Sequence, residues 1–281
     1  MAIRLIMLGD IVGTPGRQAV AQCVPGLRER YAADLVIANA ENAANGSGLT
    51  PELYSKICRA GVDAVTLGDH IYRKKQIVHT LETASNITRP ANLPAAAPGK
   101  PWMRLDIPGK RSLFVVTVLG RLFMSLPADN PFTTLDTVLA SLPEMDPIVL
   151  VEVHAEATSE KQALGWYLNG RVAAVVGTHT HVPTADARIM PATTPLDPTR
   201  RPGTAYITDI GMCGPHESVI GRSIEPVVKQ MATSMYASFD VPPGDPRVNG
   251  VFIEIDESTG RATAIERIEQ SADPNAPPFV A

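Results

Sequence analysis

The sequence predicts an α/β fold in which helices cover a mostly parallel or mixed sheet. The first seventy residues alternate short apolar runs with amphipathic stretches, which is a β-α-β-α-β rhythm. The early apolar runs do not alternate with polar residues, as expected for strands buried on both faces. Polar residues follow most of these runs, and in open α/β sheets ligands bind beyond the carboxyl ends of the strands.

The elements of the first seventy residues are predicted to be strands at 3–8, 35–38 and 64–67, with helices at 17–30 and 51–60 between them. The second half adds β-branched and apolar runs that predict more strands of the same kind. These strands are expected at 113–118, 148–153, 172–177 and 205–210, with a helix at 159–167 and a hairpin of 251–255 with 262–268.

Proline and composition set the limits of the predicted fold. Residues 89–102 and 191–202 are rich in proline and are predicted to be surface loops, because proline lacks a backbone donor and has a restricted φ. Neither an internal repeat nor a change of composition marks a boundary, so residues 1–281 are expected to form one domain. The end of the chain, residues 272–281, is expected to be held loosely.

The charge balance argues against a general nucleic-acid binder. The chain has 25 Lys and Arg against 29 Asp and Glu, a formal net charge of −4. No basic field is therefore expected to bind long nucleic acid directly. A small anionic substrate is compatible with this balance, because bound metal ions can supply positive charge locally.

The cysteines and the hydropathy pattern predict a cytoplasmic protein. Cys23, Cys58 and Cys213 are odd in number and lack Cys-x-x-Cys spacing, which favours ordinary thiols in a reducing compartment. No stretch approaches the roughly 18 apolar residues of a membrane helix. The apolar residues 1–8 are too few for the hydrophobic region of a signal peptide.

The sharpest local pattern is His179-Thr180-His181, which follows the β-branched run 172–177. Side chains of an extended chain alternate between two sides, so these imidazoles are expected to point the same way. Two imidazoles directed at one point suit zinc, iron or manganese. Two surface histidines are the alternative for this pattern on its own.

Other polar residues stand where further strands are predicted to end, and each has an ordinary interpretation alone. Asp10 suits a turn, Asn42 suits left-handed backbone, and His154 suits a hydrogen bond in a loop. Their shared position favours convergence on one site. The full set is Asp10, Glu41, Asn42, Asp69, His70, His154, His179 and His181.

This mixture of carboxylates, an amide and imidazoles is large enough to hold two metal ions. Two ions about 3.5–4 Å apart can hold a phosphoryl group and activate water, without a serine or cysteine nucleophile. Cys213 has no partnering base in sequence, and residues 9–16 lack the Lys-Ser/Thr ending of a P-loop. The pattern therefore favours metal-dependent hydrolysis of a phosphate ester.

Five motifs, in order along the chain, resemble those of the YmdB family of calcineurin-like metallophosphoesterases. They are Gly9-Asp10-Ile11-Val12-Gly13, Ala40-Glu41-Asn42-Ala43, Gly68-Asp69-His70, His154 to Glu160, and Gly177-Thr178-His179-Thr180-His181. The similarity extends through Arg89 to Asn92, Leu164 to Tyr167, Thr184 to Asp186, and Gly203 to Asp209.

The resemblance implies a four-layered α/β sandwich and hydrolysis of small phosphodiesters such as 2′,3′-cyclic nucleotides. It implies one metal held by Asp10, Glu41, Asn42 and His181, with Glu41 bridging to a second held by Asp69, His154 and His179. His70 would face the substrate and assist the leaving group. A divalent or mixed-valence pair of iron or manganese is expected, with zinc as an alternative, and self-association is a further expectation.

Three positions depart from the family pattern. Asp69 replaces a neutral asparagine and adds a negative charge, so metal preference and turnover are expected to differ. Residues 191–202 form a longer loop that either shapes access or is an exposed insertion. His216 stands where Tyr-Asp often follows Gly-Pro, and is a candidate for lining the pocket.

Two other functions fit the same residues. A phosphomonoesterase would use the same ligand set. A regulatory protein would keep the metals with little turnover. The extra charge of Asp69 favours this second alternative, whereas His70 opposes it, because a structural metal site needs no additional imidazole.

Overall fold

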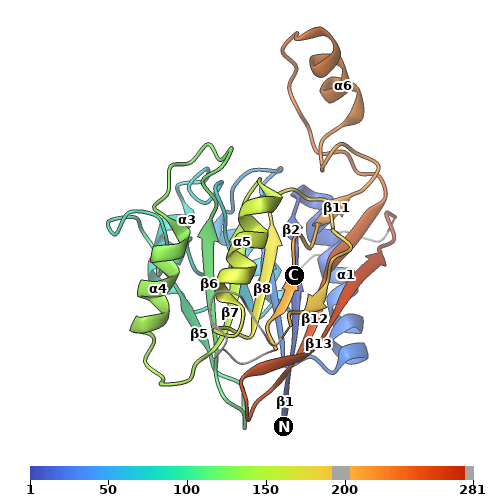
Figure 1. Cartoon of the computed structure of the whole chain (residues 1–281). Coiled ribbons are helices and arrows are strands. Elements are labelled where there is room, and N and C mark those ends of the chain that lie inside the picture. The colour runs from blue at the N-terminus through green and yellow to red at the C-terminus, as the bar shows by residue number, and fades with distance from the viewer. Residues whose placement is uncertain (192–202, 276–281) are drawn as a thin grey trace.

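Two β-sheets pack face to face, and helices cover the outer face of each sheet (Figure 1). This arrangement is seen in a computed structural model that describes residues 1–191 and 203–275. The resulting order of layers is helices, sheet, sheet, helices. It confirms the α/β sandwich predicted from the sequence and the family resemblance.

The first sheet is mixed. Within the described residues its order is β2-β11-β12-β1-β3-β4, and β13 pairs with β12. β1, β3 and β4 are parallel, whereas β12 is antiparallel to both β1 and β13. The strands are β1 (Ala2–Leu8), β2 (Asp10–Ile11), β3 (Leu35–Asn39), β4 (Ala64–Thr66), β11 (Met212–Pro215), β12 (Pro246–Asp256) and β13 (Arg261–Ser271).

The second sheet has the order β5-β6-β7-β8-β10-β9 in the part of the chain that the structure describes. Its four central strands are parallel, and its two edge strands are antiparallel to their neighbours. The strands are β5 (Met103–Leu105), β6 (Leu113–Leu119), β7 (Ile148–His154), β8 (Ala174–Thr178), β9 (Arg188–Ile189) and β10 (Ala205–Ile207).

Both faces of the central strands are buried, which explains their uninterrupted apolar sequences. In β1, Leu5 and Met7 pack between the two sheets. Ile6 and Leu8, on the other face of the same strand, pack toward the helices. The same alternation divides β7 between the layer shared by the two sheets and the layer under its own helices.

Of the helices in the described residues, five cover the sheets and the sixth projects from the body (Figure 1). Proline and a capping side chain start two of them: Thr50 accepts a hydrogen bond from the Leu53 N–H, and Asn130 accepts one from the Phe132 N–H. The helices are α1 (Gly13–Tyr31), α2 (Pro51–Arg59), α3 (Ile77–Thr83), α4 (Pro131–Ser141), α5 (Thr158–Leu168) and α6 (Ile224–Thr233). Among the described helices, none has the length and apolar character that crossing a bilayer requires.

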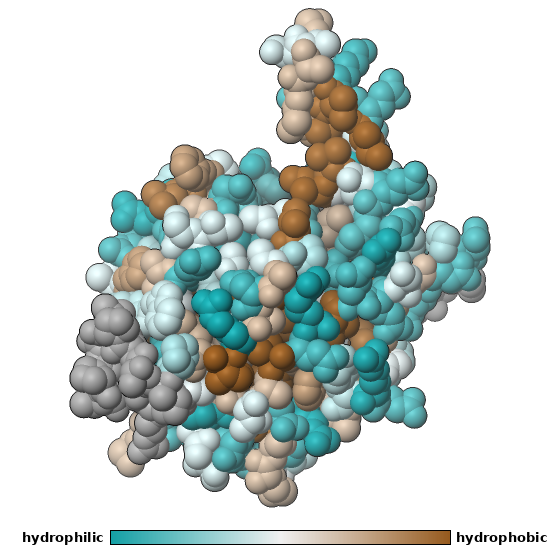
Figure 2. All heavy atoms as spheres, turned by 45° about the vertical axis from the view of Figure 1, so that its right-hand side comes forward, coloured by the Kyte–Doolittle hydropathy of each residue, from teal (hydrophilic) through white to brown (hydrophobic). Residues whose placement is uncertain are grey.

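The projecting segment, residues 220–240, is called the arm from here on. The two ends of the arm, where it joins the body, are held together by a hydrogen bond from the Ser223 N–H to the Asp240 carbonyl at 2.9 Å. Large apolar side chains are exposed along it, and a run of brown atoms descends from below its tip to the body (Figure 2). They belong to Ile220, Ile224, Val228, Met231, Met235, Tyr236 and Phe239.

The structure corrects two predictions about local structure. The strand expected at 205–210 ends at Ile207, because side chains bind the next two backbone N–H groups: Asp186 accepts from Thr208, and Thr184 accepts from Asp209. The proline-rich segment 89–102 is irregular, but its first part is buried and not on the surface, with Asn92 only 1% exposed.

The remaining loop and tail predictions fall largely outside the described residues. Of the loop 191–202, only Pro191 is described. Within the segment 272–281, the Ala272 N–H donates to the Pro246 carbonyl, and Asp273 and the Gln22 side chain exchange two hydrogen bonds. Residues 276–281 are not among those that the structure describes.

Candidate metal centre

The eight polar residues predicted from the sequence lie where strands end at one edge of the two sheets. Because neighbouring strands within each sheet are parallel here, their carboxyl ends bring the side chains together. Asp10 begins β2, His154 ends β7, Glu41 and Asn42 follow β3, Asp69 and His70 follow β4, and His179 and His181 follow β8.

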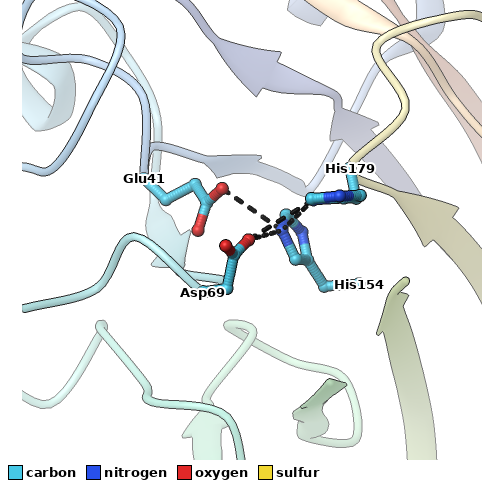
Figure 3. Close-up of side chains that lie close together, drawn as sticks. All are labelled: Glu41, Asp69, His154 and His179. Atoms are coloured by element: carbon cyan, nitrogen blue, oxygen red, sulfur yellow. Dashed lines mark hydrogen bonds and ion pairs between the residues drawn. The ribbon is translucent and has the colours of Figure 1, made fainter. Parts of the chain in front are cut away.

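Four of these residues form a tight cluster, with one side-chain donor atom from each lying within 4.8 Å of all the others (Figure 3). His154 Nε2 lies 3.1 Å from Asp69 Oδ1 and 3.2 Å from Glu41 Oε1. His179 Nδ1 lies 3.1 Å from His154 Nε2 and 3.3 Å from Asp69 Oδ1. Oxygen and nitrogen donors from both sheets thus converge on one point.

A second group lies beside the first and shares Glu41 with it. His181 Nε2 lies 3.2 Å from Asn42 Nδ2 and 3.8 Å from Asp10 Oδ1. Asn42 Nδ2 donates to Glu41 Oε1 at 3.3 Å. The His179 N–H donates to Asp10 Oδ2 at 3.2 Å. All seven residues predicted as ligands are therefore assembled, with Glu41 between the two groups.

The backbone of the histidine pair differs from the prediction. β8 ends at Thr178, and His179 and His181 have φ values of +95° and +65°, so this segment is not extended. The two rings therefore belong to different groups of ligand residues: His179 lies beside Asp69, and His181 lies beside Asp10. Left-handed backbone at two non-glycine residues is a strained arrangement that the surrounding contacts must maintain.

A buried ion pair supplies one of those contacts. Lys161 of α5 donates to Asp209 at 2.6 Å, and both side chains are 1% exposed. The same carboxylate accepts hydrogen bonds from the backbone N–H and the hydroxyl of Thr180, the residue between the two histidines. The ion pair therefore holds the loop that carries His179 and His181.

A second buried carboxylate determines the orientation of the His154 ring and which of its nitrogens carries a proton. Glu152 of β7 accepts hydrogen bonds from the Asn39 amide at 2.7 Å and from the Thr178 hydroxyl at 2.7 Å. Since the Thr178 hydroxyl donates its only proton to Glu152, its oxygen accepts from His154 Nδ1 at 2.9 Å. Nδ1 is therefore the nitrogen that keeps its proton when a metal binds, and Nε2, which lies beside Glu41 and Asp69, is the nitrogen that would take the metal.

Sequence reasoning did not identify Glu152, Lys161 or Asp209 as parts of the site. Glu152 was visible as a single carboxylate in an apolar strand, which is a signal for a buried polar network. Glycine also has a local role: a Cβ at Gly68 would overlap the His154 imidazole, so the approach of β4 to this ring requires glycine.

His70 lies at the mouth of the site, with its side chain 27% exposed. Its ring Nδ1 is 2.7 Å from Asn42 Oδ1, and its backbone N–H donates to Glu41 Oε2 at 2.8 Å. The ligand residues open into a pocket that His70 lines together with Val12, Val182, Ile220 and Arg222.

His216 does not belong to this pocket within the described residues, so the prediction that it lines the pocket is wrong. Its Nδ1 lies 3.0 Å from the Gly214 carbonyl and its Nε2 lies 2.7 Å from the Asn249 amide. These contacts tie β11 to β12, and they give His216 a structural role.

The electrostatics of the site reflect an excess of buried carboxylates. Burial raises the pKa of the Asp10 carboxyl to about 7. Burial opposes the charge on His154, but the carboxylates of Glu41 and Asp69 outweigh it and raise the pKa of the imidazole. Although burial opposes its charge, hydrogen bonds from His154 and His179 lower the pKa of Asp69. The site therefore has more negatively charged groups than positively charged ones to balance them.

Two observations fit a divalent cation at this position. Asp10 Oδ1 is buried and has no hydrogen-bond partner among the described residues. The clustered donors are oxygen and nitrogen atoms, which are the ligands of manganese, iron and zinc in proteins. A cation would supply both the missing partner and the missing positive charge.

Comparison with known sequences identifies the family of this chain. The family model described as YmdB-like protein matches residues 6–268. The 2′,3′-cyclic-nucleotide 2′-phosphodiesterase of Bacillus subtilis (strain 168) is 43% identical over 266 residues, covering 95% of this chain and 96% of the relative. A putative phosphatase/phosphodiesterase of Mycoplasma genitalium is 35% identical over 273 residues, covering 95% of this chain and 92% of the relative.

Solved structures show the same fold. A hypothetical protein from Thermus thermophilus superposes with a TM-score of 0.86 and 42% identity, covering 96% of this chain and 100% of the other. A novel phosphatase from Mycoplasma pneumoniae superposes with a TM-score of 0.88 and 34% identity, covering 96% and 94%. The chain therefore belongs to the YmdB-like protein family, as its five motifs predicted.

Proposed function

We propose that this chain is a two-metal phosphodiesterase that hydrolyses small phosphodiesters such as 2′,3′-cyclic nucleotides. The observation that carries the proposal is the assembly of two ligand groups, with Glu41 beside both, at a pocket lined by members of each group. The name of the Bacillus subtilis relative, which is 43% identical, supports this substrate class.

The proposed ligand assignment follows the two groups. Asp10, Glu41, Asn42 and His181 would hold one ion, and Asp69, His154 and His179 would hold the other together with Glu41. Iron or manganese, divalent or mixed-valence, suits this set, and zinc is the alternative. When bound, such a pair supplies charge stabilisation at the phosphoryl group and lowers the pKa of water.

His70 is the proposed catalytic group of the protein itself, assisting the leaving oxygen with a proton. Its Nδ1 faces the Asn42 amide at 2.7 Å. A half-turn of that amide would direct Asn42 Oδ1 toward the ligand group and make Nδ2 the donor to His70 Nδ1. The remaining proton of the His70 ring would then lie on Nε2, from which it can reach a substrate.

Cysteine chemistry is not required for this reaction. Cys213 is buried in β11, where burial raises the pKa of its thiol. Its Sγ lies 3.4 Å from the Asn249 carbonyl, to which it donates. A protonated and inaccessible thiol is a poor nucleophile.

The test of the proposed function is hydrolysis by metal-stripped protein with and without Mn²⁺. The substrates are bis-p-nitrophenyl phosphate, p-nitrophenyl phosphate and 2′,3′-cyclic nucleotides at equal concentration. Mn²⁺-dependent cleavage of the diesters supports the proposal, whereas cleavage of the monoester alone indicates the phosphomonoesterase alternative. Tight metal binding with no hydrolysis of any of them would indicate the regulatory alternative.

We expect Asp69→Asn to remain active and to change its metal dependence. Either side chain offers an oxygen 3.1 Å from His154 Nε2, but asparagine removes one negative charge from a crowded carboxylate site. Activity is measured across Mn²⁺, Fe²⁺ and Zn²⁺ concentrations for wild type and variant. A folded variant that binds no metal would contradict the assignment of Asp69 as a ligand.

The free cysteines support a cytoplasmic location, which we include in the proposal. Cys23, Cys58 and Cys213 form no disulfide with one another. Free thiols are usual in a reducing compartment. Small phosphodiesters are the proposed partners of the site, and direct binding of long nucleic acid is not part of the proposal.

Self-association through the arm is also proposed. Ile224, Val228 and Met231 are exposed along α6 at intervals of four and three residues, the spacing of a seam between paired helices, and Met235 is exposed just beyond the helix. A second copy presents the same stripe. The arm has two basic residues and two acidic ones, so identical arms would not repel each other; they are Arg222, Lys229, Glu225 and Asp240.

We expect Met231→Glu to lower the molar mass measured by light scattering, because a carboxylate in the seam would have to be buried. Lys229→Glu, on the same helix but outside the stripe, is the control and leaves the mass unchanged. A wild-type chain that is monomeric at high concentration would refute this proposal.

A further inference from the structure

Ile220 has a backbone conformation that isoleucine rarely adopts. Its φ is +46°, and that of Gly221 is +92°. Val219 and Arg222 exchange backbone hydrogen bonds of 2.8 and 3.0 Å across these two residues. Two successive positive φ values make this a tight turn of a kind usually built from Asn, Asp and Gly. A β-branched residue is strained at this place, and such strain at a site calls for a functional explanation.

The turn lies between the metal centre and the arm. The Ile220 carbonyl accepts a hydrogen bond from His181 Nδ1 at 2.9 Å, which leaves His181 Nε2 directed toward Asp10 and Asn42. This contact uses the backbone alone. Asparagine or glycine would provide the same carbonyl with less strain, so the contact does not explain the isoleucine side chain.

The side chain lines the pocket at the metal centre. Ile220 and Val182, the residue after the ligand His181, both line it, and they are 52% and 55% exposed to solvent. Polar and charged residues make up most of the remaining lining. Ile220 and Val182 therefore form an apolar surface beside a site that is otherwise suited to an anion.

We propose that Ile220 and Val182 are the surface against which the nucleoside part of the substrate packs while its phosphate lies at the metal centre. This inference rests on the proposed function. Aliphatic side chains have no donors or acceptors, so they bind the face of a base without distinguishing its edge. The surface therefore holds purine and pyrimidine nucleotides alike, and the strain at Ile220 is the cost of placing an apolar group there.

The test compares Ile220→Gly with Ile220→Leu in the metal-loaded protein. Glycine removes the apolar group and suits the turn, so we expect KM for 2′,3′-cyclic AMP and 2′,3′-cyclic CMP to rise about tenfold, with kcat nearly unchanged. Leucine keeps the apolar group and holds KM within about twofold of wild type. Inhibition by inorganic phosphate, which has no nucleoside, stays as in wild type for both variants.

Ala32→Gly is the matched control, because Ala32 has the same φ of +46° at the exposed end of α1. It relieves the same kind of backbone strain and leaves KM unchanged. Metal content and melting temperature are measured for every variant. Loss of metal from Ile220→Gly, or weaker inhibition by phosphate, would show that Ile220 acts through His181 and would overturn the inference.

The experiment separates this inference from the function on which it rests. A wild type that cleaves cyclic nucleotides, with an unchanged KM in Ile220→Gly, would refute the packing surface alone. A wild type that cleaves none of them would refute the proposed function. Calorimetric binding of adenosine 3′-monophosphate to the metal-loaded protein then still tests the packing surface: an affinity equal in wild type and Ile220→Gly refutes it.

Discussion

Replacing His179 with alanine is expected to lower kcat/KM for phosphodiester hydrolysis by about a thousandfold or more. Its Nδ1 lies 3.1 Å from His154 Nε2 and 3.3 Å from Asp69 Oδ1, within the four-residue cluster. Alanine offers no donor atom in its place, so one ion of the proposed pair would lose a ligand. Initial rates at saturating Mn²⁺ and metal content by mass spectrometry measure the effect together.

His79→Ala is the matched control for this prediction. His79 is an exposed histidine of α3, outside the residues that line the pocket, and its loss is expected to change neither rate nor metal content. Circular dichroism establishes that both variants are folded. If folded His179→Ala retained wild-type activity and metal content, the assignment of this ligand would be wrong.

Replacing Lys161 with methionine is expected to reduce the free energy of unfolding by about 3–5 kcal/mol. Lys161 and Asp209 are both 1% exposed and 2.6 Å apart, so removing the ammonium leaves a buried carboxylate without its counter-charge. Because Asp209 also holds Thr180, the loop of His179 and His181 should loosen and metal affinity should fall. Urea unfolding measures the stability, and calorimetry measures the affinity.

The double variant Lys161→Met with Asp209→Asn separates charge from packing. Asparagine keeps an oxygen for Thr180 but carries no charge, so much of the lost stability should return in a double-mutant cycle. Lys75→Met, at an exposed position, should change stability by only about 0.5 kcal/mol or less. Equal stability of wild type and Lys161→Met would contradict the role given to the ion pair.

Local sequence patterns predicted the central strands and the chemistry of the site. The apolar runs of β1, β3 and β7 follow from burial of both faces, and burial is a property that a strand shows in its own composition. Short edge strands bury little apolar area, so β5 and β9, of three and two residues, gave no such signal. The arm was missed for the same reason, because its apolar residues cover no core.

By itself, the sequence determined the α/β class and the eight residues that meet at the strand ends. Both could be deduced because the burial of a strand and the chemistry of a ligand depend on residue types and their order. Only the tertiary structure decided how those residues are grouped and held. Asn42 meets His181 across 139 positions, and Asn39 meets Glu152 across 113. Contacts over such separations depend on how two sheets pack, and so do the ion pair of Lys161 and the strained turn at Ile220. Local periodicity carries no information about that packing.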